Sequence, residues 1–219
     1  MASSFGPLLW AGLVFTVPLT LLSFALGLSL GSVVALIRLF GPRPLIPVVR
    51  FYVWIIRGTP LLVQLFLIFY GLPSIGIVLD ALPAALIGFT LSVGAYTSEI
   101  VRAVIEAVPR GQWEASASIG MTGAQTLRRT ILPQAARIAV PPLSNTFISL
   151  VKDTSLAAAI TVPEMFQAAQ RLVSTTYEPL ILYVEVALLY LMFSSVLSSL
   201  QSWLEHRQSM SGGFARAGA

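Results

Sequence analysis

The sequence has no cysteine, one histidine (His206) and one lysine (Lys152). The lack of cysteine excludes a disulfide framework and a thiolate metal site, and one histidine does not supply a set of nitrogen ligands for a metal. Lys152 is not preceded by glycine, so the chain has no Gly-Lys-Ser/Thr loop of the kind that holds nucleotide phosphates. Paired carboxylates and serine–histidine arrangements for covalent chemistry are also missing. We therefore expect no metal or cofactor in this chain, and no enzymatic activity of its own.

Charge is equally scarce. Charged residues make up 10% of the 219 residues, hydrophobic residues make up 56%, and the mean hydropathy is +0.85. In soluble domains about a quarter of all residues are charged, so this composition indicates an integral membrane protein in contact with lipid. The net charge of +4 does not point to nucleic acid, because the basic residues have a simpler explanation as markers of membrane orientation.

Long apolar stretches predict an all-α protein with about five transmembrane helices. We place them at residues 8–37, 61–79, 84–108, 138–162 and 179–203. The first stretch exceeds the apolar core of a signal peptide, and its arginines follow it rather than precede it, so we expect it to be a retained spanning helix.

The arginines predict the orientation, since cytoplasmic loops are rich in basic residues. An amino terminus outside the cell places eleven of them inside: Arg38, Arg43, Arg50, Arg57, Arg102, Arg110, Arg128, Arg129, Arg137, Arg207 and Arg216. Only Lys152 and Arg171 then lie outside. The polar segment 110–135 falls in the cytoplasm.

Segment 110–135 is an amphipathic interruption between apolar stretches. Trp113, Ile119 and Leu127 supply an apolar side, and we expect Gly120 and Gly123 to divide it into short helices. Pro133 follows Leu132 at a place where a new helix can begin. One interpretation is an ordinary amphipathic helix that lies on the lipid headgroups.

The spacing within this segment resembles the cytoplasmic loop of permease subunits of bacterial ATP-binding-cassette importers. The matching residues are Glu114, Ala115, Gly120, Leu132 and Pro133. Ser116 and Thr130 depart from the pattern, which has alanine and isoleucine there, and Ile131 comes one residue late. In that family the loop is a coupling helix that docks on the ATP-hydrolysing subunit.

The resemblance extends to the polar amino acid permeases of this superfamily, through Arg57-Gly58-Thr59-Pro60 with Gln64, and through 141–164. The run 149–158 is similar to cystine importers. The resemblance implies a type I importer permease fold in one domain, 1–219, in the bacterial cytoplasmic (inner) membrane. It also implies a second permease subunit, identical or a sister chain, two cytoplasmic ATPase subunits that bind ATP and Mg, and an extracytoplasmic amino-acid-binding protein. Cystine is the favoured substrate, and arginine, histidine, glutamine and glutamate are alternatives.

Two polar insertions are candidates for the substrate pathway. The first is Gly58, Thr59 and Gln64. The alternative interpretation of these residues is a simple turn before the second span. The second is Asn145 with Asp153, Thr154 and Ser155, where the carboxylate of Asp153 is suited to a substrate ammonium. A span that begins at Ile131 would leave Lys152 and Asp153 at its outer end. Pro141-Pro142 favours a start near Leu143, which carries the pair inward.

A third polar run, 96–99, precedes Arg102 and Glu106 at helical spacing. We expect Glu99–Arg102 and Arg102–Glu106 to be structural ion pairs rather than a gate or ligand site.

The competing functions are an ion-coupled carrier or passive channel, which leaves the spaced cytoplasmic motif without a purpose, and a membrane enzyme or scaffold. Co-purification of an ATPase would separate the importer from both.

Overall fold

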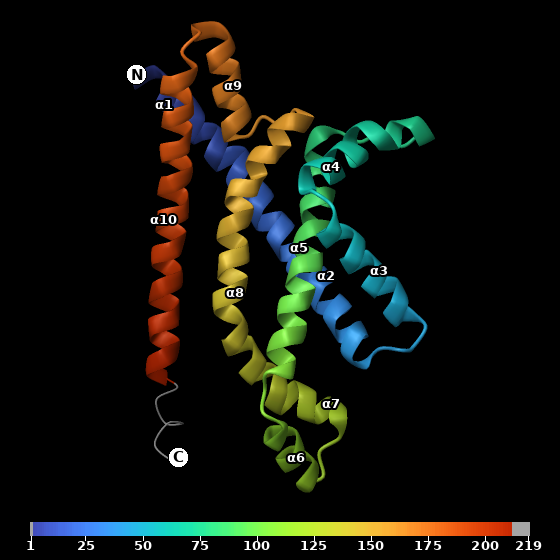
Figure 1. Ribbon diagram of the computed structural model, residues 1–219. Helices are drawn as coiled ribbons and strands as arrows, with labels where there is room; N and C mark the ends of the chain where they lie inside the picture. Colours follow the sequence, from blue (N-terminus) through green and yellow to red (C-terminus); the bar gives the residue numbers. More distant parts are fainter. Residues whose placement is uncertain (1, 212–219) are drawn as a thin grey trace.

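The computed structural model describes residues 2–211, without the side chains of 2–3, 204 and 206–211 (Figure 1). Arg216 lies outside this range, and the side chains of His206 and Arg207 are among those not described. The described chain is helical throughout its regular structure. The elements are α1 (Ala2–Ala11), η1 (Gly12–Thr16), α2 (Val17–Phe40), α3 (Leu45–Gly58), α4 (Leu61–Phe66), η2 (Leu67–Gly71), η3 (Leu72–Ile75), α5 (Ala81–Glu106), α6 (Arg110–Ser118), α7 (Gly123–Thr126), η4 (Leu127–Ile131), α8 (Leu132–Asp153), η5 (Thr154–Ile160), α9 (Met165–Thr176) and α10 (Pro179–Ser211).

Three helical segments are long and apolar enough to cross a membrane: Ser4–Phe40, Ala81–Glu106 and Pro179–Trp203. They lie where the sequence predicts the first, third and last spans. The first has 37 residues, about 55 Å of helix, which exceeds the ~30 Å of hydrocarbon. It crosses α5 at a slant in Figure 1, and a tilt is one way in which a helix longer than the bilayer is accommodated.

The predicted second span needs correction. Helix α4 and its continuation end at Ile75 rather than Leu79, and residues 76–80 form a connection without regular structure. Helix α3 and this segment together are long and apolar enough to cross a membrane, but the two parts are bent by 108° relative to each other. The bend lies at Thr59 and Pro60, which have extended backbones, because the proline ring disfavours helical geometry at the preceding residue.

The predicted start of the fourth span near Leu143 is also wrong as a helix boundary. Helix α8 begins at Leu132 and contains Pro141 and Pro142 in its interior. Pro133 occupies a first-turn position of α8, where the fixed φ of proline suits a helix. The interior prolines coincide with a helix that changes direction along its length in Figure 1. Helix α8 is not among the apolar candidate spans, so the count of five remains a prediction.

The contact between α2 and α5 is the most extensive between described elements and depends on small residues. A Cβ on Gly27 would lie 2.6 Å from the Cβ of Val93, and one on Gly31 would overlap the hydroxyl of Thr97. Thr97 is fully buried and donates a hydrogen bond to the carbonyl of Val93 at 2.7 Å. The two backbones therefore approach as closely as membrane helices with small interfacial residues do.

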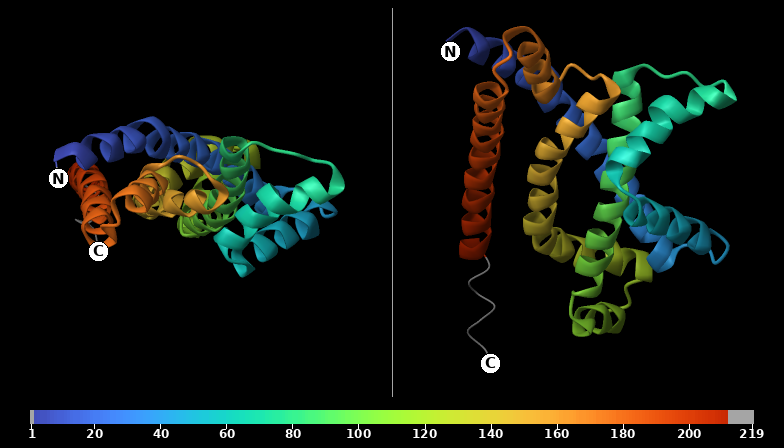
Figure 2. Two further views of the ribbon diagram at one scale, coloured as in Figure 1. Left: turned by 90° about the horizontal axis from the view of Figure 1, so that it is seen from above. Right: turned by 45° about the horizontal axis from the view of Figure 1, so that its top comes forward.

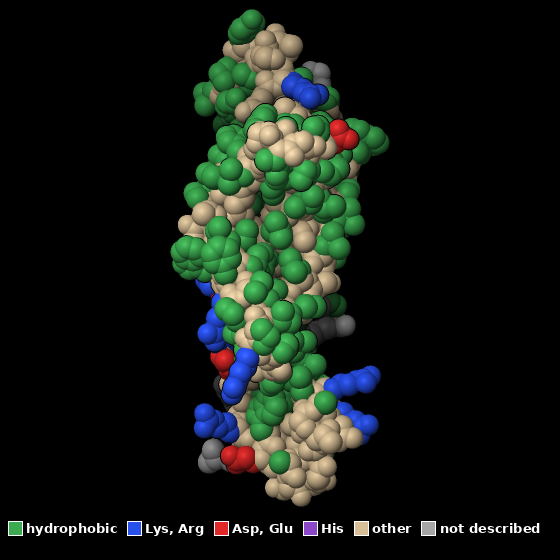
Figure 3. Space-filling view, turned by 90° about the vertical axis from the view of Figure 1, so that its right-hand side faces the viewer, with side chains coloured by type: hydrophobic (Ala, Val, Ile, Leu, Met, Phe, Trp, Pro, Cys, Tyr) green, Lys and Arg blue, Asp and Glu red, His purple; other side chains and the backbone are tan. Residues whose placement is uncertain are grey.

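The two ends of the molecule differ in charge. The amino terminus lies at one end, with α9 and the loop before α10, whereas α6 and α7 lie at the other (Figures 1 and 2). Figure 3 shows most basic side chains of one face near the α6 and α7 end, below a mainly hydrophobic middle. This polarity agrees with the arginine pattern, and the side on which the amino terminus lies remains a prediction.

Candidate functional site

The segment between α5 and α8 folds into two short helices, as the sequence predicts. Helix α6 ends at Ser118, and Gly120 turns the chain with a left-handed backbone of φ +79°. Gly123 does not divide the segment, because it is the first residue of α7. The start of α7 is fixed instead by Thr122 and Gln125, whose side chains each accept the other's backbone N–H in a capping box.

This segment is attached firmly to the helical body. Ile131 is fully buried, in a cluster with Val104, Ile105 and Val108 of the α5 end and with Ala135 and Ala139 of α8. Trp113 of α6 packs against the same cluster. A force applied to α6 and α7 therefore reaches α5 and α8 through packed side chains rather than through a loose loop.

The two departures from the family pattern contact each other. The hydroxyls of Ser116 and Thr130 are hydrogen-bonded at 3.1 Å, and Ser116 also donates to the carbonyl of Gln112 at 2.8 Å. Gln134 adds a second tie to α6, since its Nε2 donates to Oε1 of Gln112 at 3.1 Å as well as to the Thr130 carbonyl at 2.9 Å. The Ser116–Thr130 bond joins α6 to η4.

The predicted coupling residues lie on and beside this segment. Glu114 and Ala115 are exposed on α6, next to the turn at Gly120, and Ile119 is 77% exposed. Pro133 is exposed at the start of α8, whereas Leu132 is partly buried against the Ile131 cluster. The exposed members form a surface outside the helical body, and Leu132 belongs to its anchorage.

A network of ion pairs lies at the α5 end that leads to this segment. Glu99 pairs with Arg102 at 2.9 Å, and Arg102 pairs with Glu106 at 2.6 Å, which confirms both predicted pairs. Arg38 of α2 and Arg57 of α3 also approach Glu99, at 2.6 Å and 3.6 Å. Sequence spacing could not reveal these two contacts, because they join separate helices. Glu99 thereby ties α2, α3 and α5 together.

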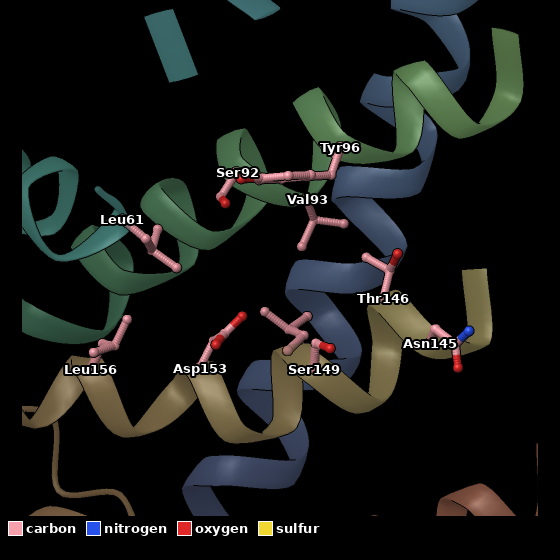
Figure 4. Close-up of a pocket in the computed structure, with 10 residues that line it drawn as sticks. Leu61, Ser92, Val93, Tyr96, Asn145, Thr146, Ser149, Asp153 and Leu156 are labelled. Carbon is pink, nitrogen blue, oxygen red and sulfur yellow. The ribbon is translucent and has the colours of Figure 1, made fainter. Parts of the chain in front are cut away.

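A cavity of about 420 Å³ lies between α5 and α8, beside the start of α4. Asp153 and Ser149 of α8 face Ser92 and Tyr96 of α5 across it (Figure 4). The remaining lining residues are Leu61, Val93, Asn145, Thr146, Leu150 and Leu156. Hydroxyls, one amide and one carboxylate thus share a pocket with aliphatic side chains, a combination that suits a small polar molecule with a cationic group.

The structure brings together only part of the predicted pathway set. Asn145 and Asp153 line the cavity, but Thr154 and Ser155 do not. Their hydroxyls donate to the carbonyls of Val151 and Lys152, both at 2.7 Å. They stabilise the transition from α8 to η5, immediately after Asp153.

Gly58, Thr59 and Gln64 belong to the bend between α3 and α4 rather than to this cavity. Buried Gln64 donates from Nε2 to the carbonyl of Ile56 at 2.7 Å and to the hydroxyl of Thr59 at 2.9 Å. These bonds satisfy backbone and side-chain groups that the bend frees. Gln64 therefore fixes the direction of α4, whose first residue, Leu61, does line the cavity.

Sequence reasoning missed Ser92, Thr146 and Ser149 as lining residues, and it assigned the run containing Tyr96 a structural role. A hydroxyl inside an apolar helix is weak evidence by itself, because it can bond to its own helix backbone. The pairing of α5 with α8 was needed to show that Ser92 faces Asp153, whereas Thr146 and Ser149 lie on the same helix as Asp153.

Glu164, at the other end of the molecule, is a buried carboxylate with three donors. It accepts the N–H groups of Phe166 and Gln167 at the start of α9, at 2.8 and 2.7 Å, and the hydroxyl of Tyr190 at 2.7 Å. Burial raises the pKa of the Glu164 carboxyl, against the effect of these hydrogen bonds. Glu164 caps α9 and ties it to α10.

Among the described residues, no group of three or more His, Cys, Asp or Glu is placed to hold a metal.

Residues 27–210 match the family described as the inner membrane component of binding-protein-dependent transport systems. The chain belongs to this family. It is 52% identical over 205 residues to the L-cystine transport system permease protein TcyB of Bacillus subtilis, covering 93% of this chain and 88% of that protein. It is 42% identical over 206 residues to the arginine transport system permease protein ArgU of Corynebacterium glutamicum, covering 87% and 65%.

The fold has the same assignment. A crystal structure of an amino acid ABC transporter with histidines contains a chain that superposes on this one with a TM-score of 0.89. The two chains are 36% identical, and the match covers 94% of this chain and 96% of that one. The predicted type I importer permease fold is confirmed. The chain is therefore a membrane-embedded subunit of a transporter, in agreement with its composition.

Proposed function

We propose that this chain is the translocating subunit of an ATP-driven importer that carries L-cystine into the cell. The observation that carries the substrate class is the 52% identity to a cystine permease over 93% of the chain. The sequence similarity of residues 149–158 to cystine importers supports the same substrate, and Asp153 and Ser149 of this run line the cavity between α5 and α8. Arginine, histidine, glutamine and glutamate are the alternative substrates.

The importer has further chains in this proposal. A second permease subunit completes the pathway in the bacterial inner membrane, an extracytoplasmic binding protein delivers the substrate, and two cytoplasmic ATPase subunits bind ATP and Mg. The family resemblance supports each of these partners. The physical logic is that a zwitterion crosses hydrocarbon poorly, so the two permease subunits must supply a polar path with alternating access, which the ATPases drive in this proposal.

The ATPases dock on α6 and the turn that follows it. Glu114, Ala115 and Gly120 form the contact surface, while Leu132 and Pro133 hold the start of α8 beside it. What supports this assignment is exposure of the first three residues combined with the buried anchorage at Ile131. Closure of the two ATPases on ATP then moves α5 and α8, which carry the two walls of the cavity.

The substrate passes through the cavity around Asp153. Its carboxylate binds a substrate ammonium, and Asn145 with Ser92 and Ser149 supplies neutral hydrogen bonds. Thr154 and Ser155 hold the end of α8 that presents Asp153. Gly58, Thr59 and Gln64 keep α4 at the angle that places Leu61 against the substrate.

The test is uptake of labelled cystine, arginine, histidine, glutamine and glutamate into vesicles that hold this chain with its ATPase and binding protein. We expect ATP-dependent uptake of cystine, with the other amino acids taken up more slowly. Faster uptake of another of them would replace the substrate. Uptake that needs no ATPase and follows an ion gradient would show a carrier instead.

A further inference from the structure

A second cavity, shallow and of about 440 Å³, lies between α2, α3 and α5. Arg38, Arg50 and Arg57 line it with Glu99, so three guanidinium groups stand against one carboxylate. Trp54 and Tyr96 contribute aromatic surface. Glu99 is further along α5 than Ser92 by seven residues, about 10 Å of helix toward the coupling end. This arginine cavity therefore lies inward of the Asp153 cavity.

The two cavities share one side chain. Tyr96 lines both the Asp153 cavity and the arginine cavity. The guanidinium carbon of Arg57 lies 5.4 Å from the centre of the Tyr96 ring, within the range of a cation–π contact. A molecule that leaves the Asp153 cavity past Tyr96 thus meets Arg57 next.

Arg57 is the least tightly held of the three arginines that pair with Glu99. Its closest approach to that carboxylate is 3.6 Å, compared with 2.6 Å for Arg38 and 2.9 Å for Arg102. Its side chain is 44% exposed, whereas those of Arg38 and Arg102 are 15% and 32% exposed. Arg57 can turn to another anion without leaving Glu99 unpaired, because the two closer arginines stay in place.

The two cavities also have opposite charge. Of the described residues that line the outer cavity, Asp153 is the one with a charged side chain. An amino acid carries a carboxylate as well as an ammonium group, and that carboxylate has only neutral donors there. The cation that matches this carboxylate is Arg57, in the arginine cavity toward the coupling end.

We propose that the arginine cavity is an inner subsite for the substrate's α-carboxylate, with Arg57 as the residue that binds it after Tyr96. This inference rests on the proposed function. Arg57 exchanges Glu99 for the substrate carboxylate as the substrate moves inward, and Tyr96 separates the two subsites. The inner subsite thereby selects amino acids over amines of the same shape.

The experiment measures binding to the purified permease–ATPase complex without the binding protein, so that the binding protein's own selectivity does not enter. Labelled L-cystine is displaced by unlabelled L-cystine or by cystamine, which keeps both ammonium groups and the disulfide but has no carboxylate. The variants are Arg57→Gln and Arg57→Lys. Arg43→Gln is the matched control, because Arg43 is exposed in the connection between α2 and α3 but does not line the cavity.

We expect Arg57→Gln to weaken L-cystine binding about tenfold and cystamine binding less than twofold, since only the former loses a charge-assisted contact. Arg57→Lys should lie between the wild type and Arg57→Gln, and Arg43→Gln should match the wild type. If Arg57→Gln does not assemble with the ATPase, Arg57→Lys carries the test and must weaken L-cystine more than cystamine.

Equal weakening of both ligands, or unchanged L-cystine binding, overturns the inner subsite. Loss of bound phosphatidylglycerol from Arg57→Gln with unchanged L-cystine binding also overturns it and assigns the arginines to a lipid headgroup. ATP-dependent cystine uptake by the wild type separates the two levels. Without it the proposed function and the inner subsite both fail, whereas uptake together with unselective Arg57 variants removes the inner subsite alone.

Discussion

The hydroxyls of Ser116 and Thr130 form a hydrogen bond of 3.1 Å between α6 and η4. Each of these residues departs from the family pattern of alanine and isoleucine. Ser116 is 4% exposed, so its hydroxyl has little access to water as an alternative partner. The two departures are one paired feature of the coupling segment.

Replacing Ser116 by alanine should lower the free energy of unfolding by about 1 kcal/mol, because the Thr130 hydroxyl loses a partner. The double variant Ser116→Ala with Thr130→Ile restores the family pattern and should be less destabilised than the sum of the single variants. Thermal unfolding of the wild type, both single variants and the double variant gives the coupling energy. Additive effects would show that the two hydroxyls are energetically independent.

The turn at Gly120 allows the docking surface to be tested with little change in the fold. A Cβ at this position meets nothing within 4 Å, although its φ of +79° disfavours side chains by about 1–2 kcal/mol. We expect Gly120→Asp to remain in the membrane but to lose ATP-driven uptake, and Glu114→Lys to do the same. Gly123→Ala is the control, since it lies in a helix with open space around it. Normal uptake by a well-expressed Gly120→Asp variant contradicts the assignment.

The close approach of α2 and α5 predicts a different outcome at Gly31. Alanine there would collide with Thr97 and with the carbonyl of Gly94, so we expect a loss of about 1–3 kcal/mol and a lower yield of folded protein. Gly6→Ala, in open space on α1, should be neutral. The yield of monodisperse protein after heating distinguishes them, and equal yields would mean that the helices separate at no cost.

Glu164 predicts a dependence of stability on pH. Its pKa is raised by burial, so the folded protein holds the carboxyl proton more tightly than the unfolded chain does. This contribution to stability is fully present below the usual carboxyl pKa and is lost as the pH rises through the raised value. Relative to Glu164→Gln, which does not titrate, the wild type should gain stability as the pH falls from 7 toward 4.5. A difference that stays constant with pH would contradict this.

The helix cap supplies a second test at the same residue. Glu164→Ala removes the acceptor for the Phe166 and Gln167 amides and should destabilise the protein by about 1–2 kcal/mol. Glu164→Gln retains a carbonyl acceptor and should lose less. Unfolding temperatures at one pH compare the three proteins, and equal losses in both variants would exclude a capping role.

The sequence predicts the features that depend on local spacing. The ion pairs of Arg102 with Glu99 and Glu106 follow from neighbouring positions on one helix, and the turn at Gly120 follows from glycine's freedom. The approach of Arg57 to Glu99 depends on how α3 packs against α5, which no local pattern records. The proline pair 141–142 led to a wrong prediction of where the fourth helix begins, because a proline in a helix interior is tolerated where neighbouring groups accommodate the bend.

The cavity shows the same division. Asp153 and Asn145 are recognisable as polar residues in an apolar context, and the structure places both at the cavity. Ser92 and Tyr96 become part of it only through the packing of α5 on α8. Gln64 is equally conspicuous in the sequence, yet its hydrogen bonds hold a bend instead of lining the cavity.

The measurement that tests the central claim most directly is ATP-dependent L-cystine uptake by Asp153→Asn in the reconstituted importer, compared with Lys152→Gln. The two residues are adjacent and exposed, but only Asp153 lines the cavity. We predict that Asp153→Asn reduces uptake at low substrate concentration at least about tenfold, since an ion pair with the substrate ammonium is lost. Lys152→Gln should retain uptake close to that of the wild type. Undiminished uptake by Asp153→Asn would contradict the assignment of this cavity as the substrate path.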